Sequence, residues 1–290
     1  MREENVKGQV RQFYDQVGWQ QDQEGLYQNA QYEDLRPVSQ EYITRCHMRV
    51  KRHLAPSGDY LLDAGSGPVQ YAAYLTYSED YKRRVCMDLS IIALKEARLR
   101  LGEKGFYIVA DISKLPFKHD AFDGIVSLHT IHHLPLEEKV GTYQGLYQCL
   151  KPGRVMVTVD GWTHVPLTPV LRLLMRIANK LKPAPPVLQK GAECTQIVEN
   201  ISHSKDSPDG TFVLKNDAIW FKNALKGYLP FKILVWRSVS VSFLRSVIRP
   251  EWGGRFWLKV LYRLEELFPK YLGEKGQYPL IVIEKPKDQI

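Results

Sequence analysis

The chain has 290 residues, of which 44% are hydrophobic, and its 40 lysines and arginines against 32 acidic residues give a net charge of +8. This length allows a large buried core and the apolar fraction is ordinary for a globular protein, which excludes a chain that is disordered throughout. The N-terminus lacks the apolar core of a signal peptide, and no run approaches the roughly 18 apolar residues that cross a bilayer, so we expect a cytoplasmic protein.

Residues 1–55 are predicted to be helical. Apolar and aromatic residues recur at helical spacing in Val6–Val17, and the pattern returns more weakly in Val38–Leu54. The first of these stripes includes Phe13, Tyr14 and Val17. We expect the two helices to form an N-terminal lid over a ligand cleft.

Residues 56–160 alternate short apolar strands with helices, which predicts an α/β core with a parallel sheet and a ligand site at the carboxyl ends of the strands. The first strand, Tyr60–Leu62, is followed by Asp63 and then by a turn that contains Gly65 and Gly67. Glycine adopts positive φ and lets a ligand approach the backbone without a Cβ in the way. This turn is the first sign of a binding site.

Three more strands end in polar residues. Arg84–Met87 ends in Asp88, at the distance from the glycine turn where an acidic side chain can accept both hydroxyls of a ribose. Tyr107–Ala110 ends in Asp111, and Phe122–Leu128 ends in the histidine-rich run His129–His133. Four strand ends in register predict a site for a nucleotide-like ligand.

Beyond a fifth strand, Val155–Val159, the pattern changes. Residues 161–231 are predicted to form a helical cap insertion, with an amphipathic helix at Leu167–Leu181 and a polar loop at Ser202–Gly210. Residues 232–290 are predicted to complete the core, with a sixth strand, a helix and a seventh strand at Lys232–Val241, Trp252–Leu267 and Tyr278–Glu284.

The core motifs resemble the class I S-adenosylmethionine-dependent methyltransferases, and more narrowly their small-molecule, methyltransferase type 11-like branch. The resemblance runs from about Tyr60 to Val159 and implies a Rossmann-like, seven-stranded, mostly parallel sheet with an antiparallel last strand. It departs from the family where Pro68–Gln70 replace the third glycine and where Arg154 follows Lys-Pro-Gly. It rests on the segments Leu62–Gly67, Asp88–Ser90, Asp111–Phe117 and Phe122–Leu134.

The resemblance implies S-adenosylmethionine as cofactor and S-adenosylhomocysteine as product. Asp63 would face the methionine end of the cofactor, directly or through water, while Gly65 and Gly67 would supply backbone approach. Asp88 would accept the ribose hydroxyls, and Leu89 beside it belongs to the same binding set. A dinucleotide site is the rival interpretation, but Gln70 stands where that fingerprint has its last glycine.

The later motifs would hold the rest of the cofactor. Asp111 would accept from the exocyclic amine of the adenine, with Ile112 packing on the ring. Leu128 and His129 would lie beside the methionine chain and the sulfonium. Each aspartate also has an ordinary structural interpretation as a helix N-cap or turn residue, which we prefer for Asp123 because it precedes its strand.

A methyl acceptor with a hydroxyl or ammonium group needs a partner that takes its proton. His133 stands where phosphobase methyltransferases carry a catalytic histidine paired with an N-terminal tyrosine, and Tyr14 is the counterpart of that tyrosine by rough position. A histidine at this motif is also common as a helix-start residue satisfied by the backbone, so both interpretations stay open. His132 is the weaker candidate.

Other chemistries have less support. His129, His132 and His133 have spacings that a helical metal site would use, but no acidic ligand follows at the usual distance, and the four scattered cysteines contain no metal-binding pair, so we expect no metal. The G-x-S-x-G elbow of serine hydrolases is missing.

The acceptor is expected to be a small apolar or anionic molecule. The first part of the cap is basic, with no Asp or Glu from Gly161 to Ala192, and its first helix is interpreted as a solvated face, as a lid over substrate, or as an interfacial helix on anionic lipid. A non-catalytic or membrane-docking cofactor-binding protein is the alternative. An RNA methyltransferase is less favoured, because the cations are dispersed. The cations of the basic segment are Arg172, Arg176, Lys180, Lys182 and Lys190.

Overall fold

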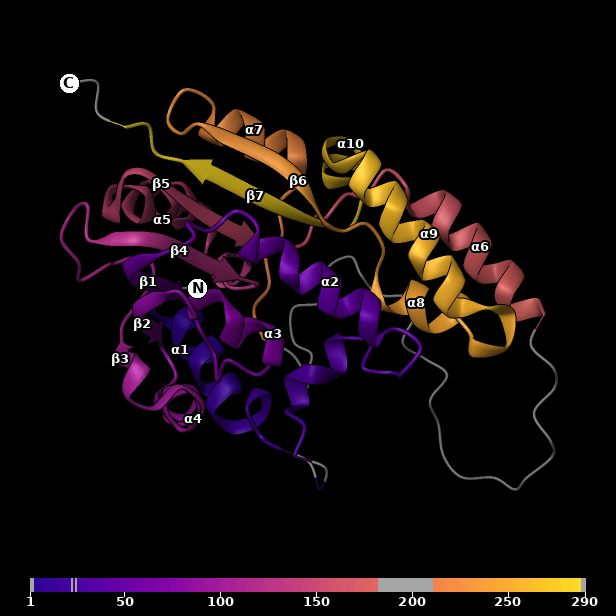
Figure 1. The fold of residues 1–290 in the computed structure, drawn as a ribbon, viewed down its shortest axis with the longest axis horizontal. Coiled ribbons are helices and arrows are strands. Elements are labelled where there is room, and N and C mark those ends of the chain that lie inside the picture. Colours follow the sequence, from indigo (N-terminus) through magenta and orange to yellow (C-terminus); the bar gives the residue numbers. More distant parts are fainter. Residues whose placement is uncertain (1–2, 22, 24, 182–210, 288–290) are drawn as a thin grey trace.

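A computed structural model describes residues 3–21, 23, 25–181 and 211–287. It contains a seven-stranded sheet with the order β3-β2-β1-β4-β5-β7-β6 (Figure 1). Strands β1 to β5 pair in parallel, and β7 lies antiparallel between β5 and β6, which confirms the predicted Rossmann-like sheet. The strands are β1 (Gly58–Ala64), β2 (Tyr81–Asp88), β3 (Gly105–Val109), β4 (Phe122–Leu128), β5 (Leu150–Val159), β6 (Phe231–Arg237) and β7 (Tyr278–Glu284).

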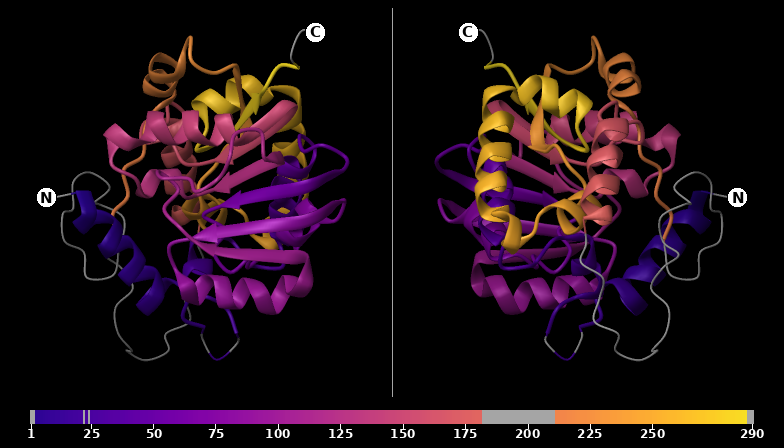
Figure 2. Two further views of the ribbon diagram at one scale, coloured as in Figure 1. Left: turned by 90° about the vertical axis from the view of Figure 1, so that its left-hand side faces the viewer. Right: turned by 90° about the vertical axis from the view of Figure 1, so that its right-hand side faces the viewer.

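Helices cover both faces of this sheet (Figures 1 and 2). The α-helices are α1 (Glu3–Phe13), α2 (Gln40–Lys51), α3 (Ala72–Leu75), α4 (Ile91–Leu101), α5 (Leu136–Cys149), α6 (Thr168–Lys180), α7 (Ala218–Leu225), α8 (Val241–Val247), α9 (Gly254–Leu267) and α10 (Pro269–Lys275). Short helices are η1 (Tyr14–Gly18), η2 (Gln28–Tyr32), η3 (Thr76–Ser78), η4 (Gly102–Lys104), η5 (Ile131–His133) and η6 (Pro250–Trp252). No helix within the described residues has the length and apolar character needed to cross a membrane.

Two hydrophobic clusters sandwich the sheet. Successive side chains of a strand point to opposite faces, so Leu61 and Leu62 of β1 belong to different clusters. Leu62 packs in the cluster that includes residues of α5 and α7, whereas Leu61 packs in the cluster that includes residues of α2, α8 and α9. Burial on both faces is typical of central parallel strands.

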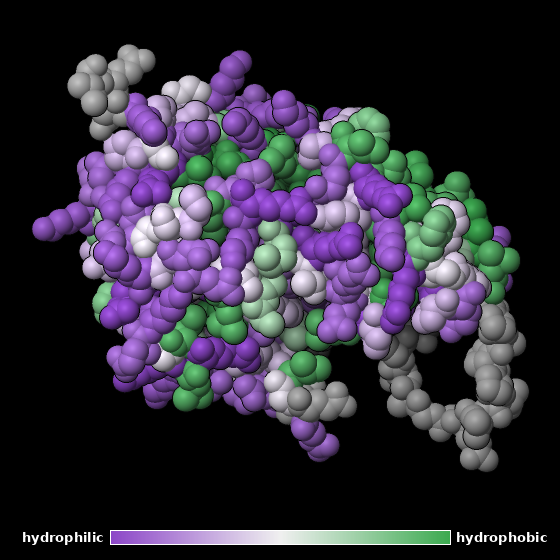
Figure 3. Space-filling model, viewed as in Figure 1, coloured by the Kyte–Doolittle hydropathy of each residue, from purple (hydrophilic) through white to green (hydrophobic). Residues whose placement is uncertain are grey.

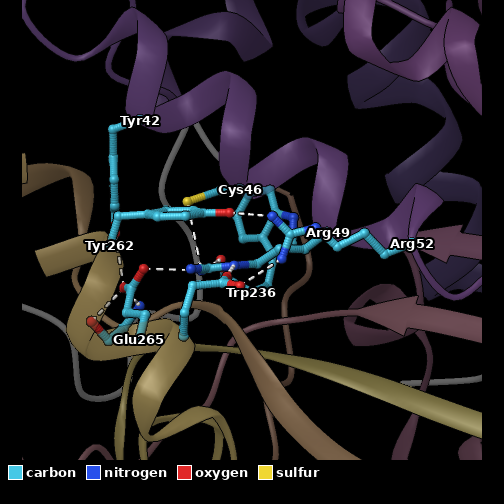
Figure 4. Close-up of polar contacts among 9 residues, drawn as sticks. Tyr42, Cys46, Arg49, Arg52, Trp236, Tyr262 and Glu265 are labelled. Carbon is cyan, nitrogen blue, oxygen red and sulfur yellow. Dashed lines mark hydrogen bonds and ion pairs between the residues drawn. The ribbon is translucent and has the colours of Figure 1, made fainter. Parts of the chain in front are cut away.

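Helix α2 is anchored to the C-terminal part of the core by a buried polar network (Figure 4). Arg49 donates to the main-chain oxygen of Trp236 at 2.7 Å and to Glu265 Oε2 at 2.9 Å, and Tyr42 donates to Glu265 Oε1 at 2.8 Å. Breaking a buried ion pair leaves an uncompensated charge, which is strongly destabilising. The second helix of the predicted lid segment is therefore fixed against α9.

Several element ends differ from the predictions. The N-terminal helix ends at Phe13 and continues as one π-helical turn, η1. Strand β6 ends at Arg237, short of the predicted Val241, because the Ser240 side chain accepts from Phe243 N and begins α8. Strand β5 begins earlier than predicted, at Leu150.

The predicted cap insertion contributes helices to both faces of the sheet. Leu171 and Met175 of α6 pack against the cluster that contains α8, while Phe221 and Leu225 of α7 lie in the opposite cluster. The polar loop at Ser202–Gly210 and the cations Lys182 and Lys190 lie outside the described residues.

Candidate active site

A cavity of about 400 Å³ opens at the carboxyl ends of the central strands. Its walls come from the loops after β1, β2 and β4, and from α1 and η1 of the N-terminal segment. All predicted site residues except Asp111 line it, namely Tyr14, Asp63, Gly65, Gly67, Asp88, Leu89, Ile112, Leu128, His129 and His133. The residues predicted at the strand ends therefore lie together, as expected for the carboxyl ends of neighbouring parallel strands.

The glycine turn after β1 is held in a conformation that side chains rarely adopt. Gly65 has a φ of +76° and Gly67 a φ of +53°. A Cβ on Gly65 would lie 2.2 Å from the side chain of Thr130, and one on Gly67 would lie 3.0 Å from the ring of Trp19. Both the backbone conformation and the close neighbours explain why glycine occupies these positions.

Asp88 fastens this turn to the start of α4. Its Oδ2 accepts from Gly67 N at 2.9 Å and its Oδ1 accepts from Ser90 N at 2.9 Å. Burial raises the pKa of Asp88 to about 6, against the two N–H donors that favour its ionised form. Each carboxylate oxygen has two acceptor positions, so each keeps one for a further donor.

Asp63 is neutralised by a buried arginine on the neighbouring strand. Arg84 of β2 donates to Asp63 Oδ2 from Nη2 at 2.5 Å and from Nε at 3.1 Å. Oδ1 takes part in neither of these bonds. A cationic group at this end of the cavity would therefore meet a paired carboxylate rather than a free charge.

Asp111 does not line the cavity and is tied to the N-terminal helix. Lys7 of α1 donates to Asp111 Oδ2 at 2.6 Å, and its Nζ lies 2.6 Å from Glu138 of α5. Burial alone would raise the pKa of Asp111, but the hydrogen bonds from Lys7 and Ser113 bring it below its usual value. Lys7 thus joins α1 to two elements of the core.

Tyr14 and His133 both line the cavity and touch each other, although they are 119 positions apart. Tyr14 Oη lies 2.9 Å from His133 Nε2, and His133 Nδ1 lies 2.7 Å from the main-chain oxygen of Phe212. A carbonyl only accepts, so Nδ1 carries the proton and Tyr14 donates to Nε2. Burial lowers the pKa of His133 to about 3 and raises the pKa of Tyr14, which keeps the pair neutral.

His132 has a carboxylate partner that the sequence analysis missed. Its Nδ1 is hydrogen-bonded to Oδ1 of Asp160, which also accepts from Gly161 N at 2.9 Å. Burial would raise the pKa of Asp160, but the adjacent His132 lowers it to about 2. Asp160 directly follows β5, so an acidic residue at the end of the fifth strand was the available signal.

The part of the cavity wall around His129 and Tyr278 is aromatic and contains a second buried ion pair. His129, with a φ of +55°, packs edge-on against Trp236 and Tyr278, and burial lowers its pKa to about 3. The Arg237 guanidinium lies 4.6 Å from the ring centre of Tyr278 and pairs with Glu33. Neither Glu33 nor Arg237 belongs to a recognisable sequence motif, so no signal in the sequence indicated this pair.

The three histidines point to separate partners instead of a shared centre. Within the described residues there is no group of three His, Cys, Asp or Glu side chains that could hold a metal ion. Asp123 lies at the opposite end of the sheet, where it accepts from Asp59 N and Tyr60 N and pairs with Lys151. Asp123 is the second residue of β4, so it is neither the N-cap nor the turn residue that was expected, and it does not line the cavity.

Comparison with known proteins identifies the domain. The family model described as "Methyltransferase domain" matches residues 62–158. The malonyl-[acyl-carrier protein] O-methyltransferase of Legionella pneumophila subsp. pneumophila is 32% identical over 103 residues, which are 35% of this chain and 36% of that protein. The chain thus aligns with about a third of the length of this curated relative.

Solved structures share the fold at low identity. Phosphoethanolamine N-methyltransferase 1 of Haemonchus contortus has a TM-score of 0.58 at 10% identity and covers 100% of this chain and 51% of its own. The [4+2]-cyclase SpnF has a TM-score of 0.52 at 16% identity over 97% of both chains. The domain match and the relative support a class I S-adenosylmethionine-dependent methyltransferase domain at residues 62–158, and the solved structures share its fold.

Proposed function

We propose that the protein transfers a methyl group from S-adenosylmethionine to a small organic acceptor. The observation that carries this proposal is the shared cavity, in which the Asp88-fastened glycine turn and the Tyr14–His133 pair face the same space. The first is the cofactor-binding part of the family pattern, and the second lies where an acceptor would have to be aligned. The names of the relatives, an O-methyltransferase and an N-methyltransferase, support the same reaction class.

The lining of the cavity suits the cofactor. Asp88 keeps acceptor positions for the ribose hydroxyls, and the backbone of Gly65 and Gly67 lines the cavity. Two lining atoms, Trp19 Nε1 and Gln70 Oε1, are buried and have no partner within the described residues. Buried polar atoms without partners are rare in proteins and are explained when a ligand satisfies them.

The bound cofactor would supply an electrophilic methyl carbon and leave as a neutral thioether. The task of the protein is then to align the acceptor, exclude water and take a proton from a hydroxyl or ammonium acceptor. Tyr14 and His133 would close the cavity and orient the acceptor. We assign the proton to His132, because Asp160 holds its Nδ1–H and would stabilise the imidazolium, in the manner of a His–Asp pair.

His133 remains the competing base. Its Nε2 would be able to take a proton once an acceptor displaced the Tyr14 hydroxyl, but its pKa of about 3 makes it a weak base in the closed cavity. The pair therefore fits an aligning role better than a proton-accepting one.

The acceptor class is proposed from the walls of the cavity. They combine aromatic rings, Tyr71, Tyr74 and Tyr278, with the cation Lys215, which suits an apolar ring or chain that carries a hydroxyl or an anionic group. Phenols, quinols and carboxylic acids are therefore the acceptors to screen first.

Calorimetric titration tests the cofactor assignment. We expect micromolar binding of S-adenosylmethionine and S-adenosylhomocysteine, lost in Asp88→Ala and kept in Asp80→Ala, a substitution in the loop before β2. Binding of NAD alone would overturn the proposal. Because SpnF is a cyclase by name with the same fold, cofactor binding without transfer to any screened acceptor would instead favour a non-catalytic or differently catalytic protein.

A further inference from the structure

An exposed apolar face lies at the end of the molecule formed by α6, α9 and α10, away from the first strands of the sheet (Figure 1). We call it the α6/α9 face. The right-hand view of Figure 2 looks onto both helices, and hydrophobic residues gather along this edge in Figure 3. The exposed fractions of its side chains run from 42% for Leu174 to 70% for Leu267. The face consists of Val170, Leu173, Leu174, Ile177, Leu181, Phe256, Trp257, Leu264, Leu267, Phe268 and Tyr271.

Helix α6 has two apolar stripes and only one core to bury. Leu171, Met175 and Ala178 form the stripe that packs inward. Beside it, a second stripe at the same helical spacing, Val170, Leu174, Ile177 and Leu181, is exposed to solvent. A third row completes the helix surface with the exposed cations Arg172, Arg176 and Lys180.

Helix α9 repeats this arrangement. Leu258 and Tyr262 pack inward, and the exposed apolar row contains Phe256, Trp257, Leu264 and Leu267. The neighbouring row carries the exposed cations Arg255, Lys259 and Arg263. The acidic residues of α9, Glu265 and Glu266, are already paired with Arg49.

Many exposed apolar side chains at one end of a protein mark an interaction site. Here each apolar row is bordered by a row of cations, and Phe256, Trp257, Phe268 and Tyr271 are of the aromatic kind that favours the boundary between lipid and water. A two-fold pair of copies would bring the same surface patch, with its six cations, against itself. Charge complementarity therefore favours an anionic partner over a second copy.

We propose that the α6/α9 face docks on the surface of an anionic lipid membrane, with its apolar rows at the acyl boundary and its cation rows among the headgroups. The docking is independent of the methyl transfer proposed above. Neither cation row lines the cavity, so docking and cofactor binding are separable by experiment.

Co-sedimentation of the full chain with vesicles tests the docking, using phosphatidylcholine alone and phosphatidylcholine mixed with phosphatidylglycerol. We expect binding to the mixed vesicles only. Replacing Ile177, Trp257 and Leu267 together by serine is expected to weaken it by roughly tenfold or more, because lost apolar burial is the main term. Replacing Arg255, Lys259 and Arg263 by glutamate is expected to cost at least about fivefold for each cation.

Matched changes on α4 serve as controls, since that helix lies at the other end of the molecule (Figure 1). Leu99→Ser removes a side chain that is 80% exposed, and Lys95→Glu with Arg98→Glu reverses charge there. Both controls should bind vesicles as the unchanged chain does. Equal loss in the controls, equal binding to neutral vesicles, or no binding at all would overturn the proposal.

Sedimentation velocity tests the other possible partner of this face, a second copy of the chain. The unchanged chain could form a dimer that becomes a monomer when Ile177, Trp257 and Leu267 are replaced. If the unchanged chain also fails to bind anionic vesicles, the face binds a second copy and the membrane proposal is wrong. Calorimetric binding of S-adenosylhomocysteine by each variant shows that its fold is kept, so a loss of vesicle binding is then a property of the face.

Discussion

Tyr14 donates a hydrogen bond to Nε2 of His133, with 2.9 Å between the two atoms, and thereby joins the N-terminal segment to the end of the fourth strand. Both residues line the cavity at the strand ends. Because His133 Nδ1 is used by the Phe212 carbonyl, the tyrosine is the donor that satisfies the other ring nitrogen. In the proposed reaction the pair would hold the acceptor in position.

Tyr14→Phe is expected to lower turnover while leaving the cofactor affinity nearly unchanged. The substitution removes the donor and leaves a buried acceptor on His133, which should also cost about 1–2 kcal/mol in the free energy of unfolding. Turnover, calorimetry and urea unfolding measure the three quantities. Tyr228→Phe, at a position 64% exposed in the loop after α7, is the matched control. Full turnover in Tyr14→Phe would contradict an aligning role.

His132→Asn and Asp160→Asn are expected to lower the rate of the chemical step by roughly 10²–10⁴-fold for an acceptor that must lose a proton. Both should still bind cofactor, because neither belongs to the cofactor-binding set. His119→Asn, in the loop before β4, is the control.

The comparison with His133→Ala decides between the two histidines. If His132→Asn is active and His133→Ala is not, the proton goes to His133, and the low pKa of His133 does not prevent it from acting as the base. If both are active with a hydroxyl acceptor, the reaction needs no side-chain base and the pairs are structural.

The position of the cavity could be predicted because strand ends carry the signal. Short apolar segments that stop at Asp63, Asp88 and Asp111 are visible in sequence, and parallel pairing places those ends along one edge. The same rule applied to Val155–Val159 would have found Asp160. By contrast, the ion pairs of Arg84 and Lys7 do not depend on any regular spacing of residues in the sequence. Their partners, Asp63 and Asp111, could therefore not be predicted.

The Tyr14–His133 contact shows a different limit. Nothing in the spacing of two residues 119 positions apart indicates that they touch, and only the resemblance to phosphobase methyltransferases suggested the pair. Element ends were predictable where the apolar pattern decides them, as at Tyr278–Glu284. They were missed where a local hydrogen bond decides, as at the Ser240 cap that begins α8.

Cofactor affinity is expected to depend on pH through Asp88. Its pKa is raised to about 6, so the free protein holds this carboxyl increasingly protonated as the pH falls below 6, whereas accepting from two ribose hydroxyls requires the ionised form. Affinity should therefore be constant above about pH 6 and fall by up to about tenfold for each pH unit below it. Calorimetry with S-adenosylhomocysteine between pH 4 and 7 measures this.

Asp88→Asn provides the control for that pH dependence. It keeps the shape of the side chain and removes the titration, so its affinity should be weaker by ~1.5 to 3 kcal/mol at pH 7 and flat across the range. A pH dependence that persists in this variant would assign the titration to another group and remove the support for the ribose contact.

Gly65→Ala is expected to destabilise the protein by more than the backbone conformation alone explains. Gly65 and Gly227 both have positive φ, +76° and +84°, but a Cβ at Gly227 meets nothing within 4 Å, whereas one at Gly65 lies 2.2 Å from Thr130. Gly227→Ala should therefore cost ~1 kcal/mol from strain alone, and Gly65→Ala clearly more. Urea unfolding measures both free energies.

Adding Thr130→Ala to Gly65→Ala removes the clashing methyl and hydroxyl groups and should restore part of the lost stability. Equal costs for the two single substitutions would show that Thr130 yields freely and that the turn is less tightly held than its contacts indicate.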